Sequence, residues 1–318
     1  MNLMNETEKY IFSTYKRFPI ALLKGKGTRV WDQDGKEYLD FFSGLAVCSL
    51  GHCHPKVVEA IEAQAKNLLH VSNLFHTKPQ VDLARLLVEN SFADKVFFCN
   101  SGAEANEGAI KLTRKYMRDK KQDRFEIITM HNSFHGRTLA TVTATGQEKF
   151  QEGFAPLMPG FKHVPFDDMD SVQRAVTDKT AAIMVEPIQG EGGVNCPSEN
   201  YFKELKAFCA EKKLLLIFDE IQVGLGRTGK LFAYEHYGVT PDIMTLAKSL
   251  AGGLPIGALL ARDEIAKSFI PGTHASTFGG NPLVTAAGIA AFTALKDPAL
   301  LENCRAVGAY FMGELNRL

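Results

Sequence analysis

The chain has 318 residues, and its 45% hydrophobic and 23% charged content is typical of a soluble globular protein. The 36 basic and 36 acidic residues cancel to a formal net charge of zero, and no basic run indicates nucleic acid as a partner. No apolar stretch reaches the roughly 18 residues that span a membrane, and the N-terminus lacks the basic start and apolar core of a signal peptide.

The sequence divides into an irregular N-terminal segment and a longer part in which strand-like and helical patterns alternate. Residues 1–45 are predicted to form an irregular arm with a hairpin around the turn signal Asp34-Gly35. Beyond the arm, strand-like runs alternate with helical periodicity, which predicts a mostly parallel sheet covered by helices on both faces. Strands are expected at residues 29–32, 37–41, 96–99, 126–130, 181–185, 214–218, 243–245 and 256–260. Helices are expected to begin at Pro55 and Pro298 and to span about 78–90, 102–118, 199–212 and 282–295.

A chain of this length is expected to form one large α/β domain and a smaller one. We assign residues 1–50 to an N-terminal arm with a hairpin of the small domain, 51–285 to the large domain and 286–318 to the start of a C-terminal small domain. The last segment keeps its helical periodicity up to Leu318, without a glycine cap, a helix breaker or a polar tail. We therefore expect the small domain to be truncated and the sequence to be a fragment.

The cysteines indicate the redox compartment. Cys53 lies between His52 and His54, but neighbouring side chains of an extended segment point in opposite directions, so we expect no metal site. The scatter of the cysteines through apolar stretches indicates reduced, mostly buried thiols and a cytoplasmic protein. They lie at positions 48, 53, 99, 196, 209 and 304.

A carboxylate and a lysine carry the main chemical hypothesis. The apolar run 214–218 ends in Asp219, which places this acid at the carboxyl edge of the sheet, where α/β folds bind ligands. Lys248 lies in the apolar, small-residue segment 246–253, where loss of solvation lowers the pKa of an amine and makes it nucleophilic. Together they suggest a carbonyl cofactor bound to the lysine, with the carboxylate paired to a protonated ring nitrogen. The simpler alternative is a sheet-edge aspartate and an ordinary solvated lysine.

Two segments are candidates for binding a phosphate group. Ser101 is a good N-cap and Gly102 allows close approach, so the first turn of the helix 102–118 is a potential anion site. Thr277, in the tight loop 276–282, could add a hydroxyl contact. The alternative for both segments is a capped helix start without a ligand.

Two further segments are candidates for contacts to a ring and a substrate. Phe134 could lie flat on a planar ring, and Arg137 could bind a carboxylate through two hydrogen bonds. A core phenylalanine and a surface arginine are the alternative. Glu191, in the glycine-rich loop 186–193, could face an arginine or be solvated.

From about Tyr15 to its last residue, the chain resembles class III pyridoxal-phosphate aminotransferases of fold type I. The resemblance implies the fold of that class, with a mostly parallel central sheet, helices on both faces and a smaller terminal domain that is incomplete here. It depends on the motifs FSGLAV (42–47), LGHCHP (50–55), HVSNLF (70–75), FFCNSGAEAN (97–106), FHGRT (134–138), EPIQGEGG (186–193), DEIQ (219–222) and TFGGNP (277–282).

The resemblance implies roles around the ring of pyridoxal 5′-phosphate. Lys248 would hold the cofactor covalently and would then move a proton between the substrate carbon and the cofactor. Asp219 would keep the ring nitrogen protonated, so that the ring accepts electrons. Phe134 and Ile221 would pack on the two ring faces, and Gln222 would reach the ring hydroxyl.

The resemblance also implies the phosphate contacts and the assembly. Gly102 and Ala103 would donate backbone N–H groups to the phosphate, with Ser101 supporting the turn, and Glu220 is expected among the cofactor contacts. Thr277 would bind the phosphate of the other subunit's cofactor. A homodimer with shared active sites is therefore implied.

For the substrate, the resemblance implies that Arg137 binds a carboxylate, with Ser276 nearby. Glu191 corresponds to the family's gate residue, which pairs with a second arginine in the C-terminal small domain. Neither Arg305 nor Arg317 lies in a motif that matches this arginine.

The implied activity is transfer of the δ-amine of an acylated ornithine to 2-oxoglutarate, with glutamate as a product, by a ping-pong mechanism in arginine biosynthesis. Ornithine, succinylornithine, succinyl-diaminopimelate and 4-aminobutyrate stay open as alternative ω-amino substrates. The partners are thus expected to be small molecules rather than nucleic acid or a membrane. A non-catalytic module with the same fold is one rival hypothesis. A nicotinamide-dependent dehydrogenase is another, but no GxGxxG motif follows the first strands.

Overall fold

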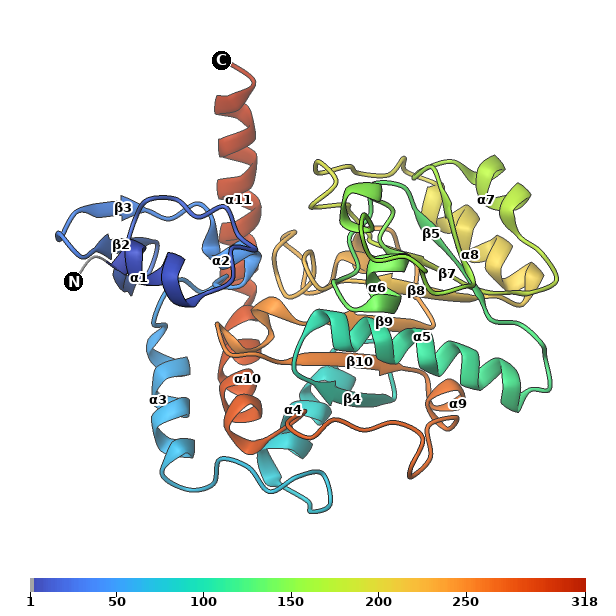
Figure 1. Ribbon diagram of the computed structural model, residues 1–318, viewed down its shortest axis with the longest axis horizontal. Helices are drawn as coiled ribbons and strands as arrows, with labels where there is room; N and C mark the ends of the chain where they lie inside the picture. Colours follow the sequence, from blue (N-terminus) through green and yellow to red (C-terminus); the bar gives the residue numbers. More distant parts are fainter. Residues whose placement is uncertain (1–2) are drawn as a thin grey trace.

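A seven-stranded sheet forms the centre of the molecule in the computed structural model, which describes residues 3–318 (Figure 1). The strands are β4 (Lys95–Cys99), β5 (Glu126–Met130), β6 (Phe161–Val164), β7 (Thr180–Val185), β8 (Leu215–Asp219), β9 (Ile243–Leu246) and β10 (Gly257–Ala261). Their order is β4-β10-β9-β8-β7-β5-β6. Within the described chain, β10 is the one strand of this sheet that runs antiparallel to its neighbours. This confirms the prediction of a mostly parallel sheet.

Helices cover both faces of this sheet, as predicted from the alternation of strand-like and helical segments along the sequence. In β8, Ile217 packs against Ile110 of α5 on one face, whereas Phe218 packs against Phe202 of α8 on the other. The helices are α1 (Leu3–Tyr10), α2 (Ser43–Ala46), α3 (Pro55–Ala65), α4 (Lys78–Glu89), α5 (Gly102–Asp119), α6 (Leu139–Ala144), α7 (Met169–Ala175), α8 (Tyr201–Lys212), α9 (Asp263–Ala266), α10 (Pro282–Leu295) and α11 (Pro298–Leu315). Short 3-10 turns are η1 (Glu148–Phe150), η2 (Ala233–His236) and η3 (Lys248–Ala251).

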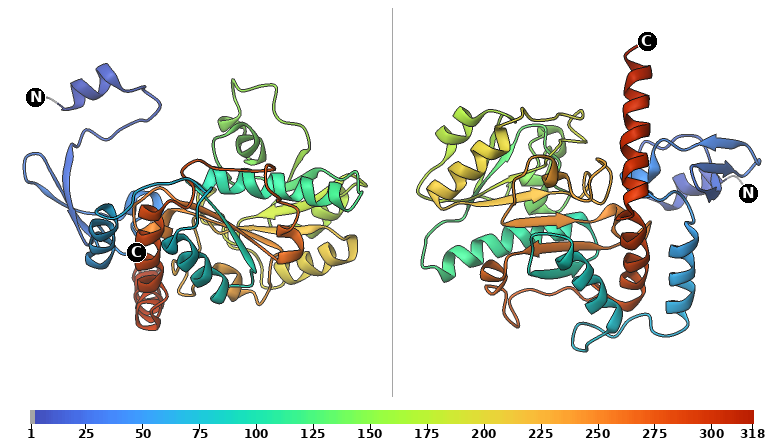
Figure 2. Two further views of the ribbon diagram at one scale, coloured as in Figure 1. Left: turned by 90° about the horizontal axis from the view of Figure 1, so that it is seen from below. Right: turned by 180° about the vertical axis from the view of Figure 1, so that it is seen from behind.

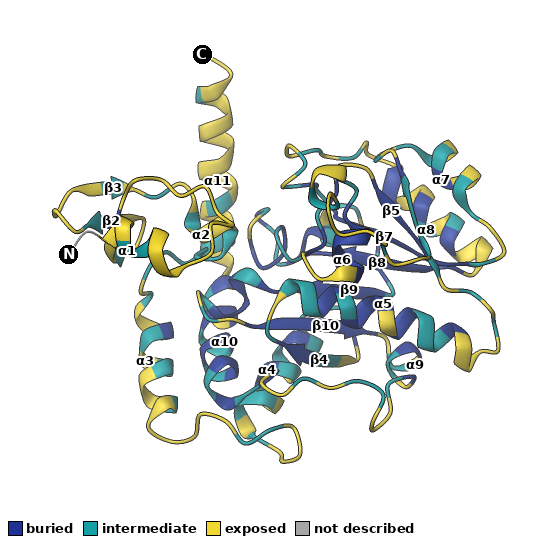
Figure 3. Ribbon diagram, in the orientation of Figure 1, coloured by how far each residue is buried: buried dark blue, intermediate teal, exposed yellow. Residues whose placement is uncertain are grey.

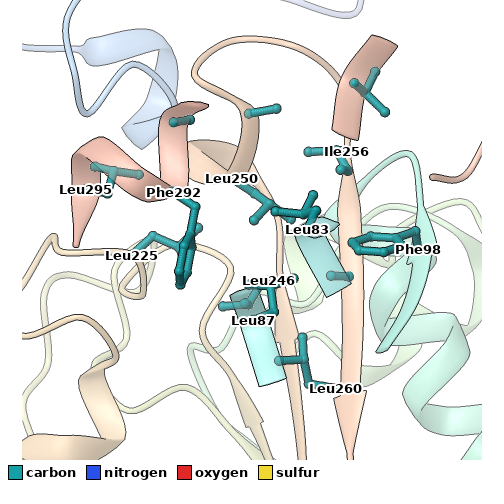
Figure 4. Packing of buried hydrophobic residues seen from close by; sticks show 14 of the residues in the cluster. Leu83, Leu87, Phe98, Leu225, Leu246, Leu250, Ile256, Leu260, Phe292 and Leu295 are labelled. Atoms are coloured by element: carbon teal, nitrogen blue, oxygen red, sulfur yellow. The ribbon is translucent and has the colours of Figure 1, made fainter. Parts of the chain in front are cut away.

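A separate apolar cluster lies between β4, β9, β10, α4 and α10. Leu83 of α4 and Phe292 of α10 are fully buried there, beside Leu246 and Leu260 of the sheet (Figure 4). Because Leu246 immediately precedes the segment that carries Lys248, this cluster fixes one end of the candidate site.

The N-terminal arm and the last helix lie at the edge of this body. The strands β1 (Leu22–Lys26), β2 (Arg29–Asp32) and β3 (Glu37–Leu39) form a small antiparallel sheet, which contains the predicted hairpin. The helix α11 extends away from the sheet, and its surface is exposed along most of its length (Figures 1, 2 and 3). Within residues 3–318, no single helix is long and apolar enough to cross a membrane; α10 and α11 meet that test only as a pair bent by 62°.

Most predicted elements are confirmed within two or three residues, but several short ones were missed. These are α1, β1, α2, α6, β6, α7 and α9. In α6 three of the six residues, Thr141, Val142 and Thr143, are β-branched, so its helical form depends on burial rather than on propensity. The helix predicted to begin at Pro55 is α3, which ends at Ala65. The domain boundaries at residues 50 and 285 stay a prediction.

Candidate active site

A cavity of about 450 Å³ lies at the carboxyl ends of β4, β7, β8 and β9. Nine of the residues predicted for the site line it: Ser101, Gly102, Ala103, Phe134, Arg137, Asp219, Ile221, Gln222 and Lys248. Parallel strands present their carboxyl ends at one edge, so residues up to 147 positions apart meet in one crevice.

The first turn of α5 forms one wall of the cavity. The Ser101 side chain caps the helix by accepting a hydrogen bond from Glu104 N at 3.1 Å. The N–H groups of Gly102 and Ala103 form no hydrogen bond within residues 3–318, so they are free to bind an anion at the positive end of the helix dipole. A Cβ on Gly102 would lie 2.8 Å from Ile221 Cδ1, which explains the need for glycine at this position.

Asp219 ends β8 as a buried carboxylate within a hydrogen-bond network. Its Oδ2 lies 2.8 Å from both Asn106 Nδ2 and His135 Nδ1, and its Oδ1 accepts from Ile221 N at 3.1 Å. Burial lowers the pKa of His135, but the hydrogen bond and charge of Asp219 outweigh burial and raise it overall. The raised pKa of His135 favours a protonated ring, which can donate a hydrogen bond to Asp219. Since a carboxylate has about four acceptor sites, Asp219 can also accept from a ring N–H in the cavity.

Asn106, which sequence reasoning missed, orients this network. Its amide N–H groups donate to Asp219 and to the backbone oxygen of His135, and its oxygen accepts from Thr245 Oγ1 at 2.8 Å. Asn106 lies on the same helical face as the buried residues Ala109 and Ile110. A polar residue on an apolar helix face was thus the signal that could have revealed it.

Lys248 follows β9 and lines the same cavity. Its Nζ forms no hydrogen bond or ion pair with any residue from 3 to 318. Burial lowers the pKa of Lys248, although the negative charges of Asp219, Glu186 and Glu191 act in the opposite direction. A lowered pKa increases the fraction of neutral amine, which is the nucleophilic form.

Glu186 is a second buried acid at this edge that the sequence prediction left without a role. Burial raises its pKa to about 7, and His135 opposes that effect. Its Oε1 accepts from Phe134 N at 2.9 Å, which fixes the backbone of the aromatic residue beside the cavity. A glutamate that follows a fully buried strand was the signal for this position.

Phe134 and Arg137 lie at the rim of the candidate active-site cavity. The guanidinium of Arg137 lies 3.9 Å from the centre of the Phe150 ring and 5.7 Å from that of Phe134. Arg137 is exposed and forms no salt bridge within the described chain, so its N–H donors are available to a carboxylate that enters the cavity.

Four predicted residues do not line this cavity. The carboxylate of Glu220 points instead to the backbone N–H groups of Ala233 and Tyr234, both at 2.7 Å, so the structure places it away from the expected cofactor contacts. Glu191 is exposed in its loop. Ser276 and Thr277 line a separate cavity of about 320 Å³.

The residues present fit the cofactor that the resemblance implies. Free N–H groups at a helix start suit a phosphate, a buried acid with spare acceptor capacity suits a protonated ring nitrogen, and an amine without a hydrogen-bond partner suits an aldehyde. All three groups face one cavity large enough for a small ring compound.

Comparison with known proteins identifies related chains. The family model of class-III aminotransferases matches residues 10–318. The chain is 57% identical over 312 residues to the acetylornithine aminotransferase of Caldanaerobacter subterraneus, covering 98% of this chain and 79% of that protein. It is 52% identical over 322 residues to the acetylornithine aminotransferase of Methanocaldococcus jannaschii, covering 100% of this chain and 80% of that protein.

Solved structures show the same relationship. An ornithine aminotransferase from Toxoplasma gondii, described with partial occupancy of PLP at its active site, has a TM-score of 0.96 and 40% identity, over 99% of this chain and 75% of that one. The acetylornithine aminotransferase of Elizabethkingia anophelis has a TM-score of 0.87 and 36% identity, over 99% of this chain and 78% of that one.

Proposed function

Because the chain belongs to the class-III aminotransferase family, whose cofactor is pyridoxal 5′-phosphate, we propose that it is an acetylornithine aminotransferase. It moves the δ-amine of N2-acetyl-L-ornithine to 2-oxoglutarate, forming N-acetyl-L-glutamate 5-semialdehyde and glutamate, a step of arginine biosynthesis. The observation that carries this assignment is the 52–57% identity to curated acetylornithine aminotransferases over nearly the whole chain.

The residues of the cavity divide the work of holding the cofactor. Gly102 and Ala103 would bind the phosphate, and Phe134 and Ile221 would enclose the ring. Asp219 would bind the ring N–H. When bound, the cofactor supplies an aldehyde for the amino group and a ring that accepts the electron pair released as a substrate proton leaves.

Lys248 has two tasks in this site. Its neutral amine is the nucleophile that holds the cofactor, and once released it is the base that takes a proton from the substrate carbon and returns it. Arg137 orients the substrate by binding its carboxylate at the rim. Because both half-reactions use these same groups, the kinetics are expected to be ping-pong.

The test is product formation from defined substrates. Purified protein with pyridoxal 5′-phosphate, N2-acetyl-L-ornithine and 2-oxoglutarate should form glutamate, and Lys248→Ala should abolish both turnover and the visible absorbance of the lysine-bound cofactor. Lys203→Ala, which removes an exposed lysine of α8, is the matched control and should change neither. Retention of the band and of full turnover in Lys248→Ala would refute the role of Lys248.

Ornithine is the second candidate substrate, because the Toxoplasma gondii structure that matches at a TM-score of 0.95 is an ornithine aminotransferase. Initial rates with acetylornithine, ornithine, succinylornithine, succinyl-diaminopimelate and 4-aminobutyrate at equal concentrations separate these activities. A higher kcat/KM for ornithine than for acetylornithine would replace the first assignment with the second.

We also propose a homodimer with shared sites. Thr277 is exposed and lies outside the cavity of its own chain, in a loop where Asn73 donates to the backbone oxygens of Ser276 and Gly279. A hydroxyl held in this way at the surface suits contact with the phosphate site of a second copy.

Subunit complementation tests the shared site. Thr277→Ala and Lys248→Ala homodimers should both be impaired, whereas mixing them should restore activity, because a mixed dimer contains one site with both residues intact. Activity that stays at the sum of the two homodimers despite subunit exchange would contradict a shared site.

We further propose that the protein is cytoplasmic, since its six cysteines form no disulfide within the described residues. Fractionation of the producing cells tests this location, and recovery of the protein outside the cytoplasm would overturn it.

A further inference from the structure

A chain of hydrogen bonds links the N-terminal segment to the residue after Lys248. An Arg227 guanidinium N–H donates to Ser49 Oγ at 2.8 Å, and Ser49 Oγ lies 2.7 Å from Ser249 Oγ. Ser249 Oγ in turn donates to the backbone oxygen of Ala46 at 3.1 Å. Because each hydroxyl has one proton, Ser249 uses its proton on Ala46 and must accept from Ser49. The chain therefore runs in one direction, from Arg227 through Ser49 and Ser249 to Ala46.

The turn that carries Lys248 has little support of its own. Lys248 adopts a φ of 45°, in the left-handed region that a side chain with a Cβ disfavours. The η3 turn has only four residues, and its N-cap residue Ala247 provides no side-chain hydrogen bond. Such a conformation persists only when surrounding contacts determine it. Ser249, which is only 4% exposed, supplies one such contact through a hydroxyl directly after Lys248.

The segment that receives Ser249 is itself held firmly. Asp40 Oδ1 accepts from the backbone N–H groups of Phe42 and Ser43, and Asp40 Oδ2 lies 2.6 Å from His52 Nε2. These contacts fix both ends of the loop that contains Ala46 and Ser49. The loop can therefore act as an anchor for the turn at Lys248.

Arg227 supports the chain from the opposite side. Its side chain is partly exposed to a second cavity of about 480 Å³, which Ser49 also lines, and it forms no salt bridge within residues 3–318. Its positive charge is also among the groups that lower the pKa of Lys248, together with burial. Arg227 thus acts on the lysine turn through both a hydrogen bond and its charge.

We infer that Ser49, Ser249 and Arg227 are positioning residues for Lys248, and that they hold its turn against the segment 43–51. The inference rests on the role proposed above for Lys248, because it concerns the placement of that amine. The three residues lie up to 200 positions apart, and Ser49 and Arg227 do not line the candidate active-site cavity.

The rate at which the apoprotein binds its cofactor at Lys248 tests this inference. Apoprotein is mixed with pyridoxal 5′-phosphate, the bond formed between the amine and the aldehyde with loss of water is reduced with borohydride, and labelled peptides are quantified by mass spectrometry. Ser49→Ala and Ser249→Ala each remove the Ser49–Ser249 hydrogen bond and one further bond, to Arg227 or to Ala46 respectively. Each should slow labelling of Lys248 about fivefold. The double variant should be slower than either single variant, but by less than the product of the two effects, because both substitutions remove the same Ser49–Ser249 bond.

Matched variants separate positioning from general damage. Ser268→Ala removes an equally buried hydroxyl, which bonds to Asp119 beyond α9, and should label at the wild-type rate. Ser49→Thr keeps the hydroxyl and should recover most of the rate. The visible circular dichroism of the bound cofactor, which depends on its orientation, should change in the two alanine variants only.

The outcomes are distinguishable. Equal labelling rates at Lys248 in wild type, Ser49→Ala and Ser249→Ala, with equal thermal stability, would overturn the inference while leaving the proposed function intact. Failure of the wild-type protein to label at Lys248 would instead refute the proposed function. Equal slowing at the other lysines would indicate general damage and would also refute a positioning role.

Discussion

The helices α5 and α11 have the same length, 18 residues, but opposite environments (Figure 3). Eight residues of α5 are buried, whereas none of α11 is. The apolar side of α5 faces the sheet, and the first turn of α5 lines the candidate active-site cavity. By contrast, α11 exposes large apolar residues, including Tyr310, Phe311 and Met312.

Of these two helices, α5 contributes residues to the candidate site and α11 does not. Asn106 on α5 connects Asp219, His135 and Thr245 in one network. The contacts of α11 with the rest of the molecule are few by comparison. Arg305 donates to the backbone oxygen of Gly229, Cys304 Sγ lies 3.4 Å from the backbone oxygen of Arg227, and the Phe311 ring stacks on Phe41 with 6.3 Å between ring centres. Changes in the two regions should therefore differ in size.

The largest difference is expected from truncating an apolar side chain in each helix. Ile110→Ala in α5 should lower the free energy of unfolding by about 2–5 kcal/mol, because it leaves a cavity under the sheet. Met312→Ala in α11, where the side chain is 56% exposed, should change it by less than about 0.5 kcal/mol. Urea unfolding measures both values, and similar losses would remove the contrast between the helices.

The polar network of α5 should give the next largest effect. Asn106→Leu keeps a similar size but leaves the Thr245 hydroxyl and the His135 oxygen unpaired, and removes one donor from Asp219. We expect a loss of about 3 kcal/mol in the free energy of unfolding, with weaker cofactor binding. The matched change Asn316→Leu, at the exposed end of α11, should affect neither quantity. Wild-type cofactor affinity in Asn106→Leu, measured by absorbance titration, would show that Asp219 does not depend on this network.

Much of the site could be predicted because its residues follow strands within short motifs. Asp219 and Lys248 needed only an apolar run and a small-residue setting to be noticed. Their partners could not be predicted in this way. Asn106 lies 113 positions from Asp219, and no local pattern indicates which distant residue satisfies a buried acid.

The same reason explains the errors in the fold. The strand β6 is only four residues long and includes Lys162 and His163, so its sequence lacks a strong strand signal and its pairing with β5 decides its structure. The resemblance placed Glu220, the neighbour of Asp219, among the expected cofactor contacts. Successive residues at a strand end point in opposite directions, and the structure turns Glu220 toward the η2 turn instead.

Glu220 provides a pH-dependent prediction for the buried region. Burial raises its pKa from 4.5 to about 8, although two backbone N–H groups oppose this. The folded state therefore binds a proton more tightly than the unfolded chain, so the stability from this group is full below pH 4.5 and is lost as pH rises toward 8. Between pH 5 and 8, wild type should lose about 3–4 kcal/mol relative to Glu220→Gln. Parallel pH profiles of the two proteins would contradict the prediction.

The smallest effect is expected at an ion pair on α11. Arg317 Nη1 lies 2.7 Å from Glu314 Oε1, but the arginine side chain is 75% exposed. Water screens such a pair, and holding two long side chains in one geometry costs entropy, so Glu314→Gln should lower the free energy of unfolding by less than about 0.5 kcal/mol. The loss should shrink further in 1 M salt, measured by urea unfolding. A loss above 1 kcal/mol would mean that α11 is anchored as tightly as α5, and the contrast between the two helices would then reflect exposure alone and not stability.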